Sequence, residues 1–160
     1  MKIRPKREAS FVALYIKNFK PWDNHSPMNA FVVIRRYTME IGFVGGLVDP
    51  GETPLETVIR EVNEEINYEM NHNNLIHICS HYFEEDDFAT HLFAKEITFD
   101  DYKEIISNSV QSEHFGKEIF GIDLILDTDL NEIKTIETFL KSPLAKSVKE
   151  EIEELRKFLN

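Results

Sequence analysis

The sequence has little cysteine, glycine or proline, and these shortages exclude several classes of protein. Of its 160 residues, one is cysteine, six are glycine and six are proline, and no low-complexity tract, repeat or domain linker stands out. The single cysteine, Cys79, excludes an internal disulfide and is typical of a reducing compartment. We expect Cys79 to be a small core residue rather than a nucleophile. With 42% hydrophobic and 29% charged residues, the composition is that of an ordinary globular chain.

Long apolar runs are absent as well. The basic segment Met1–Arg7 leads into Phe11–Ile16, which is too short for the core of a signal peptide and is followed by Lys17. No stretch approaches the roughly 20 apolar residues that a membrane-spanning helix needs. We therefore expect no membrane association and an intracellular location, either cytoplasmic or nuclear.

Positive charge is in short supply. The 18 lysine and arginine residues face 29 aspartate and glutamate residues, which gives a formal net charge of −11. Broad binding to a nucleic-acid backbone needs a basic footprint, so the composition argues against it. A nucleotide ligand is still compatible, because bound metal ions reverse the local sign of a carboxylate-rich site. The best basic patch for a long RNA is Lys2, Arg4, Lys6 and Arg7, although a solvated N-terminal tail is the simpler interpretation.

Segments rich in β-branched and aromatic residues are interspersed with amphipathic ones, and a turn-rich loop spans Lys20–Pro27. The expected strands are Phe11–Ile16, Ala30–Arg36, Leu75–Phe83, His91–Ile97 and Glu118–Leu126. The expected helices are Pro54–Ile66, Asp100–Asn108, Lys134–Leu140 and Leu144–Leu159, and Gly42–Pro50 is expected to be a glycine-containing connection. This order predicts a single α/β domain over residues 1–160, with a mixed β-sheet sandwiched between α-helices.

The clearest helix signals surround Pro54. Thr53 is a good N-cap, Pro54 suits the first helical position, and Glu56 completes a capping box. Apolar residues form a stripe that is expected to pack on the sheet: Leu55, Val58, Ile59, Val62 and Ile66. The last expected helix carries a similar stripe, for which packing on the sheet is a commoner use than binding a partner: Leu144, Val148, Ile152, Leu155 and Leu159.

Three glutamates share a neighbouring face of the helix after Pro54. Glu61, Glu64 and Glu65 stand at helical spacings of three and four, where like charges repel one another. A set of hard oxygen ligands for Mg²⁺ or Mn²⁺ removes that penalty, whereas the alternative for three glutamates alone is a solvated acidic face. Glu52 can fold back to the same place, and Arg60 can orient a carboxylate through bidentate hydrogen bonds.

The complete spacing around these glutamates resembles the Nudix box, the signature of a family of hydrolases. It runs from Gly46 over five residues to Glu52, and over seven more to Arg60-Glu61-Val62, followed after one residue by Glu64-Glu65. The resemblance implies a Nudix fold and hydrolysis of a diphosphate linkage in a nucleotide. Asn67 stands where the family usually has glycine. Asparagine is the best substitute in a left-handed helix cap, so we expect the turn to survive.

Four segments outside the box are similar to the small nucleolar RNA-decapping branch of the family, whose members also hydrolyse inosine diphosphates. These segments are Ile41–Asp49, His91–Thr98, Gly116–Gly121 and Thr138–Leu140. By this resemblance, Mg²⁺ or Mn²⁺ is held by Glu61, Glu64 and Glu65 with support from Glu52, and Glu65 and Arg60 take part in catalysis. The resemblance also implies a substrate site at Arg36, Phe43, Gly45 and Gly46.

Three further residues have two interpretations each. Phe11 stands where the branch would have a histidine, which puts specificity for inosine in doubt and favours a core role. His81 matches a position near the metal site of the branch, but a lone histidine on a strand also serves as a structural residue. Glu118, at the start of a late strand, is a candidate metal ligand or base, or else an exposed carboxylate. The acidic segment Glu84–Asp87 is expected to be a solvated hairpin tip.

Two classes of function stay open. The first is a Mg²⁺- or Mn²⁺-dependent hydrolase in which a metal-bound water attacks a diphosphate, acting on an RNA 5′ cap or on a nucleoside diphosphate such as IDP. The second is an inactive Nudix-fold module that binds RNA or a protein. The presence of all three metal glutamates favours the enzyme. The acidic composition favours free nucleotides, the branch resemblance favours capped RNA, and a homodimer is one of the oligomeric states left open.

Overall fold

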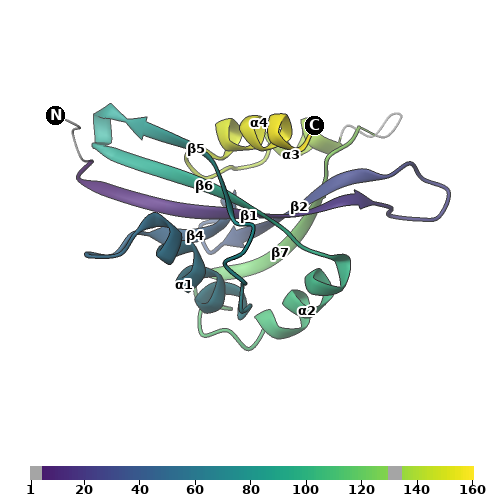
Figure 1. Cartoon of the computed structure of the whole chain (residues 1–160), viewed down its shortest axis with the longest axis horizontal. Helices are drawn as coiled ribbons and strands as arrows, with labels where there is room; N and C mark the ends of the chain where they lie inside the picture. Colours follow the sequence, from purple (N-terminus) through teal and green to yellow (C-terminus); the bar gives the residue numbers. More distant parts are fainter. Residues whose placement is uncertain (1–4, 130–134) are drawn as a thin grey trace.

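In the computed structural model, residues 5–129 and 135–160 are described, and they form a mixed sheet with helices on both faces (Figure 1). The strands are β1 (Arg7–Phe19), β2 (Met28–Arg36), β3 (Ile41–Gly42), β4 (Val44–Leu47), β5 (Ile76–Phe83), β6 (Phe88–Glu96) and β7 (Ile119–Leu126). The helices are α1 (Pro54–Ile66), α2 (Phe99–Ser109), α3 (Thr135–Leu140) and α4 (Val148–Leu159). The predicted α/β class and mixed sheet are confirmed.

Strand β1 lies at the centre of the sheet. It pairs in parallel with β6 and antiparallel with both β2 and β4. Beyond these neighbours, β5 pairs with β6, while β3 and β7 pair with β2, all antiparallel. The β5–β6 hairpin is joined by a 3₁₀ turn, η1 (Glu84–Asp86), which is exposed as predicted for the acidic tip. Because β1 touches both β4 and β6, it links the segment that precedes α1 to the strand that faces α4.

Successive side chains of β1 point to opposite faces of the sheet and supply two separate cores. Val12 and Leu14 on one face are fully buried with residues of α1, and Ala13 and Tyr15 on the other pack with residues of α4. Figure 1 shows α1 and α2 on one side of the sheet, and α3 and α4 on the other. The apolar stripes predicted for α1 and α4 therefore cover opposite faces.

Helix α1 begins and ends as the sequence predicts. Thr53 accepts a hydrogen bond from the backbone of Glu56, the Glu56 carboxylate accepts one from the backbone of Thr53, and Pro54 is the first helical residue. Asn67 closes the helix in the left-handed conformation with φ of 51°. Leu55 departs from the expected stripe, because it is 40% exposed in the first turn while the residues further along are buried or partly buried.

Three predicted segments differ most from the structure. The segment Gly42–Pro50 is not only a connection, since β3 and β4 lie within it and β4 pairs with β1. Strand β1 is longer than Phe11–Ile16, because its parallel ladder with β6 starts at Arg7. Helix α4 starts at Val148 rather than at Leu144, which forms a bridge with Ile41 instead. The predicted helix start at Lys134 lies outside the described residues. In the part of the chain that is described, no helix has the length and apolar character to cross a membrane.

Candidate active site

Arg60 holds three glutamate carboxylates together beside α1, and the carboxylate of Asp49 lies 3.6 Å from its Nη2. Its Nε and Nη2 donate to the two oxygens of Glu52 at 2.9 and 3.0 Å, which is the bidentate geometry expected from the sequence. Its Nη1 donates to Glu61 at 2.8 Å and to Glu64 at 3.1 Å. A single guanidinium therefore offsets the repulsion among glutamates that come from the helix and from the loop before it.

The loop between β4 and α1 is fixed to this cluster through Glu52. Its carboxylate also accepts hydrogen bonds from the Thr57 hydroxyl at 2.7 Å and from the Asp49 backbone N–H at 3.2 Å. The hydrogen bonds from Arg60, more than any other contact, lower the pKa of Glu52 to about 2. Arg60 Nη2 also donates to the carbonyl of Leu47 at 3.1 Å. Glu52 therefore acts as a fixed anion that positions Arg60 and the loop.

Glu65 lies on the inner side of the same helix and is only 1% exposed. Arg36 Nη1 donates to one of its oxygens and the Gly45 N–H to the other, each at 3.0 Å. Burial raises the pKa of Glu65 to about 7, although Arg36 and Gly45 favour the ionised form. The carboxyl group of Glu65 can therefore gain or lose a proton near neutral pH.

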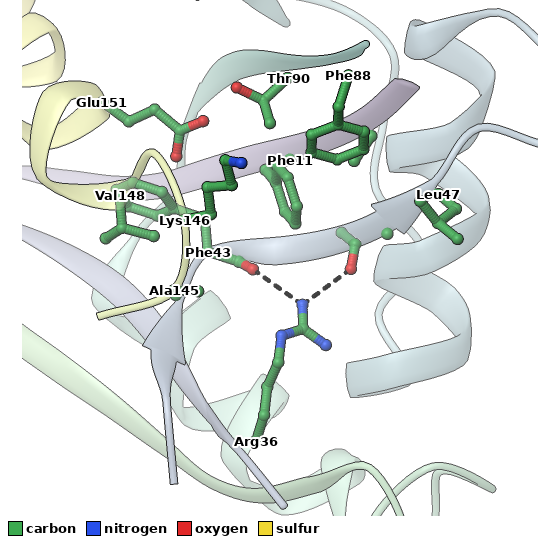
Figure 2. A pocket seen from close by; sticks show the side chains of 14 residues that line it. Phe11, Arg36, Phe43, Leu47, Phe88, Thr90, Ala145, Lys146, Val148 and Glu151 are labelled. Atoms are coloured by element: carbon green, nitrogen blue, oxygen red, sulfur yellow. Dashed lines mark hydrogen bonds between the residues drawn. The ribbon is translucent and has the colours of Figure 1, made fainter. Parts of the chain in front are cut away.

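Arg36 connects Glu65 to the backbone of the strand that precedes the box. Its Nη2 donates to the carbonyl of Gly45 at 3.0 Å and to that of Phe43 at 3.5 Å (Figure 2). Gly45 has φ of 150°, and a Cβ there would come within 2.1 Å of the Ser10 carbonyl. Glycine at this position lets β4 lie directly against β1.

Gly46 makes room for a glutamate of the box. A Cβ on Gly46 would lie 2.5 Å from Oε1 of Glu61, closer than van der Waals contact allows. The Glu61 side chain is 12% exposed, and burial raises its pKa above the ordinary value. The glycine of the box thus allows a mostly buried carboxylate to lie against β4.

A cavity of about 230 Å³ extends from this region toward α4 (Figure 2). The four residues predicted to bind substrate are among those that line it: Arg36, Phe43, Gly45 and Gly46. The Phe43 ring is only 1% exposed and packs against the ring of Phe31 at 6.1 Å. Phe11 both packs against the core under α4 and lines the cavity, so it fits each of its two interpretations.

Glu151 also lines this cavity, although it was not predicted from the sequence. It projects from α4, lines the cavity and is 1% exposed, and burial raises its pKa to about 7. Thr90 of β6 and Lys146, just before α4, line the same cavity. A signal was present, because Glu151 falls three residues after Val148 and four before Leu155, within the apolar stripe of the helix.

The structure separates His81 from the glutamates of α1. His81 lies opposite Thr90 in the β5–β6 ladder, which places it on the sheet face that α4 covers. Its Nδ1 is buried, with no hydrogen-bond partner among the described residues. Cys79 on the same strand is half-buried against the core under α4, and burial raises the pKa of its thiol to about 12, which fits a structural residue.

Glu118 lies nearer to the site but contacts it only indirectly. Its exposed carboxylate is 3.0 Å from Nδ1 of His114, and its carbonyl accepts a hydrogen bond from the backbone of Tyr37, the residue after Arg36. The same loop touches α1, since the Ser112 hydroxyl donates to the carbonyl of Glu64. Within residues 5–129 and 135–160, no hydrogen bond or ion pair joins the Glu118 side chain to the glutamates of α1.

The donor chemistry of the cluster suits a hard divalent cation. Carboxylate oxygens are the ligands that Mg²⁺ and Mn²⁺ prefer, and Glu61, Glu64 and Glu65 supply them from one helix. Across the described ranges, no three carboxylate, imidazole or thiolate groups already stand in the arrangement of a metal site. The glutamates are bound instead to Arg60 and Arg36, so holding a metal requires these side chains to exchange partners.

Comparisons with known proteins agree with the fold and with the box. Residues 8–157 match the family described as Nudt16-like, U8 snoRNA-decapping enzyme-like. A search of curated proteins found no match.

Among solved structures, a mutT/nudix family protein from Listeria innocua superposes with a TM-score of 0.66 at 16% identity, over 97% of this chain and 94% of that one. The Nudix domain of Shewanella oneidensis NrtR, solved with ADP ribose, gives 0.63 at 14% identity over 100% and 91%. A bifunctional NMN adenylyltransferase/ADP ribose pyrophosphatase from Francisella tularensis, solved with AMP and a Mn ion, gives 0.60 at 12% identity over 100% and 44%.

The helix with its box, the sheet on which it packs and these matches define a Nudix hydrolase. Within that class, the chain belongs to the Nudt16-like family, described as U8 snoRNA-decapping enzyme-like.

Proposed function

We propose that residues 1–160 act as a single domain that hydrolyses a diphosphate linkage in a nucleotide with the help of Mg²⁺ or Mn²⁺. The bond cleaved is either that of an RNA 5′ cap or that of a free nucleoside diphosphate such as IDP. One observation carries the proposal: the box glutamates converge on Arg60 beside the buried Glu65, next to a cavity large enough for a nucleobase.

The proposed metal ligands are Glu61, Glu64 and Glu65. When bound, the metal ions would lower the pKa of a water and neutralise charge on the phosphate oxygens. Glu61 and Glu64 share one nitrogen of Arg60, Nη1, whereas Nε and Nη2 bind Glu52. Arg60 can therefore release the two helix carboxylates while Glu52 keeps its guanidinium in place.

Proton transfer near neutral pH is available at Glu65. Without a metal, burial raises its pKa to about 7, which makes Glu65 a candidate to accept the proton of the water when it is not itself bound to a cation. The Gly45 N–H and the Arg36 guanidinium stabilise its ionised form and fix its orientation. Glu118 remains a candidate base because its loop touches α1 through Ser112. His81 is the weaker candidate, because it lies on the opposite face of the sheet.

The substrate is proposed to enter with its base in the cavity and its phosphates toward the box. Arg36, Gly45 and Gly46 line the end of the cavity beside Glu61 and Glu65. The volume of about 230 Å³ is below the range of roughly 300–1,000 Å³ typical of sites that enclose a whole drug-sized ligand. A base fits such a volume, and the phosphates and any attached RNA would then lie outside it.

A second observation favours an RNA substrate over a free nucleotide. Lys6 and Arg7 line a groove of about 390 Å³ together with the loop that holds Asp49 and Glu52. The basic start of the chain therefore lies beside the catalytic loop, where it could contact the backbone of an attached RNA. The net charge of −11 favours the free nucleotide instead, so both substrates belong in the test.

The test is hydrolysis of a substrate panel that contains capped RNA and nucleoside diphosphates, with Mn²⁺ or EDTA. Wild type is compared with Glu65→Gln and with Glu69→Gln, a matched control at an exposed glutamate beyond the end of α1. We expect metal-dependent product from wild type and the control, and a rate at least about a hundredfold lower from Glu65→Gln. Equal product from all three proteins would refute the role of Glu65.

The same panel separates the remaining alternatives. Intact capped RNA together with cleaved free diphosphates would identify an enzyme of nucleotide sanitation. Absence of product from wild type with every substrate would favour an inactive binding module, the alternative that the intact set of glutamates disfavours.

A further inference from the structure

A lysine and an aspartate connect two walls of the cavity. Lys146, in the segment between α3 and α4, lines the cavity, and its ammonium group forms an ion pair with Asp86 of the turn η1. This turn leads into β6, whose first residue, Phe88, lines the same cavity. Figure 2 shows the Lys146 side chain extending from the α4 side of the cavity toward Thr90 and Phe88. The ion pair therefore bridges the opening between these two walls, which we call the mouth of the cavity.

Aromatic rings of the β5–β6 hairpin support the same connection. The Lys146 ammonium lies 4.4 Å from the centre of the Phe83 ring, and Phe83 stacks on Phe88 with ring centroids 6.4 Å apart. The Arg7 guanidinium lies 5.9 Å from the centre of the Phe88 ring and ties the start of β1 to this group. A cation over an aromatic face is attracted by the charge distribution of the ring. Lys146 thus has two partners in the hairpin, one acidic and one aromatic.

The partner that Lys146 takes indicates a role across the mouth. Glu151 is buried in the same cavity, and an ion pair with a lysine would offset the cost of burying its carboxylate. Within the described ranges, no lysine or arginine forms such a pair, and the ammonium of Lys146 extends to Asp86 instead. Asp86 belongs to the acidic segment Glu84–Asp87, whose combined negative charge attracts the lysine.

The backbone that carries Lys146 is fixed, whereas its side chain is free to move. The Ala145 N–H donates to the Ile41 carbonyl at 2.9 Å, and the Val148 N–H donates to the Ala145 carbonyl at 3.2 Å. The Lys146 and Asp86 side chains are 47% and 52% exposed, so salt and water compete with their ion pair. An exposed ion pair and an exposed cation–π contact together favour the joined state by a factor of about 3 to 30. Such a factor slows the exchange of a ligand without preventing it.

We propose that Lys146, bound to Asp86 and Phe83, is a strap that closes the mouth of the cavity and controls how fast a nucleotide enters and leaves. The inference rests on the function proposed above only in that a nucleotide occupies the cavity, and it assigns neither a base nor a catalytic step. When the ion pair opens, the Lys146 side chain swings outward and the cavity becomes accessible. Because the strap closes over the empty and the occupied cavity alike, it slows association and dissociation together and leaves the affinity unchanged.

The test measures the exchange of mant-IDP, a fluorescent nucleoside diphosphate, by stopped-flow fluorescence in EDTA, so that no hydrolysis contributes. Asp86→Asn removes the ion pair, and Lys146→Met removes both the ion pair and the contact with Phe83. Each variant should raise the association and dissociation rate constants together, by about 3- to 30-fold for Lys146→Met and by less for Asp86→Asn, with Kd changed by less than about twofold. The double variant should behave like Lys146→Met, because the two residues form one contact.

Two controls remove the same charges from neighbouring exposed positions. Glu85→Gln lies in the same turn and Lys149→Met in the first turn of α4, and both should keep the wild-type rates. Salt gives a second measurement, which a purely structural role for the ion pair would not change. Raising NaCl from about 50 to about 500 mM should bring the wild-type rates toward those of Asp86→Asn, because salt screens the exposed pair.

The outcomes separate the strap from the proposed function. Wild-type rates in both variants would overturn the strap, as would a failure of mant-IDP to bind. A rise in the dissociation rate alone would also overturn it, because Lys146 would then contact the ligand directly instead of closing the mouth. Gated exchange in a protein that hydrolyses nothing would sustain the strap and overturn the proposed function, whereas hydrolysis with ungated exchange would overturn the strap alone.

Discussion

The buried carboxyl group of Glu151 makes the stability of the fold depend on pH. Burial raises its pKa from 4.5 to about 7, and at about 1.4 kcal/mol per pKa unit this corresponds to about 3 kcal/mol. The unfolded chain releases this proton near pH 4.5, whereas the folded chain keeps it up to about pH 7. Between these values the folded state binds more protons, so ionisation of Glu151 lowers the free energy of unfolding as the pH rises.

Glu151→Gln removes this dependence while keeping the shape of the side chain and an acceptor for Ser147. Urea unfolding should show little difference between wild type and variant near pH 5, and a variant more stable by up to about 3 kcal/mol at pH 8. Glu65, whose pKa is also about 7, is common to both proteins, so its titration cancels in the difference. Glu153→Gln is the control, because it removes the same charge from an exposed position of α4, and its free energy of unfolding should equal that of wild type at every pH. A difference between Glu151→Gln and wild type that stays constant from pH 5 to pH 8 would refute the reasoning.

Three further changes test the cluster around Arg60 and the C-terminal end of α1. Arg60→Gln leaves its glutamates without their shared cation and should lower the free energy of unfolding by about 2–3 kcal/mol in EDTA. Adding Mn²⁺ should restore much of the melting temperature, and no recovery would count against a metal at this position. Gly46→Ala should displace the Glu61 carboxylate and reduce kcat more than stability, and unchanged kcat in the hydrolysis assay would contradict the tight contact. Asn67→Gly should leave the free energy of unfolding unchanged or raise it, and Asn67→Val should lower it by about 1–2 kcal/mol in urea unfolding. Equal effects of the two variants would show that the left-handed cap is unimportant.

Local chemistry explains which parts of the fold could be predicted. The start of α1 depends on Thr53, Pro54 and Glu56, and its end on Asn67, all of which are neighbours in the sequence. The length of β1 depends instead on its ladder with β6, more than 70 residues away, which no local pattern reveals. The start of α4 was misplaced because the apolar spacing continues back to Leu144, although hydrogen bonds with Ile41 hold that segment outside the helix.

The candidate site divides in the same way. The spacing of the box brings Glu61 and Glu64 to one face of a helix, and the bidentate contact between Arg60 and Glu52 follows from side-chain chemistry. The cavity is assembled from strands and a helix that are distant in the sequence, so its shape could not be predicted. Glu151 was missed because α4 contains several other glutamates, and only the position of this one within the apolar stripe distinguishes it.

The most direct test of the central claim is the binding of Mn²⁺, followed by electron paramagnetic resonance, in wild type, Glu61→Gln and Glu69→Gln. If the glutamates of α1 hold the metal, wild type and Glu69→Gln bind Mn²⁺ alike, and the affinity of Glu61→Gln falls by about tenfold or more. Equal affinities in all three proteins, or no binding to wild type in the presence of nucleotide, would contradict the account.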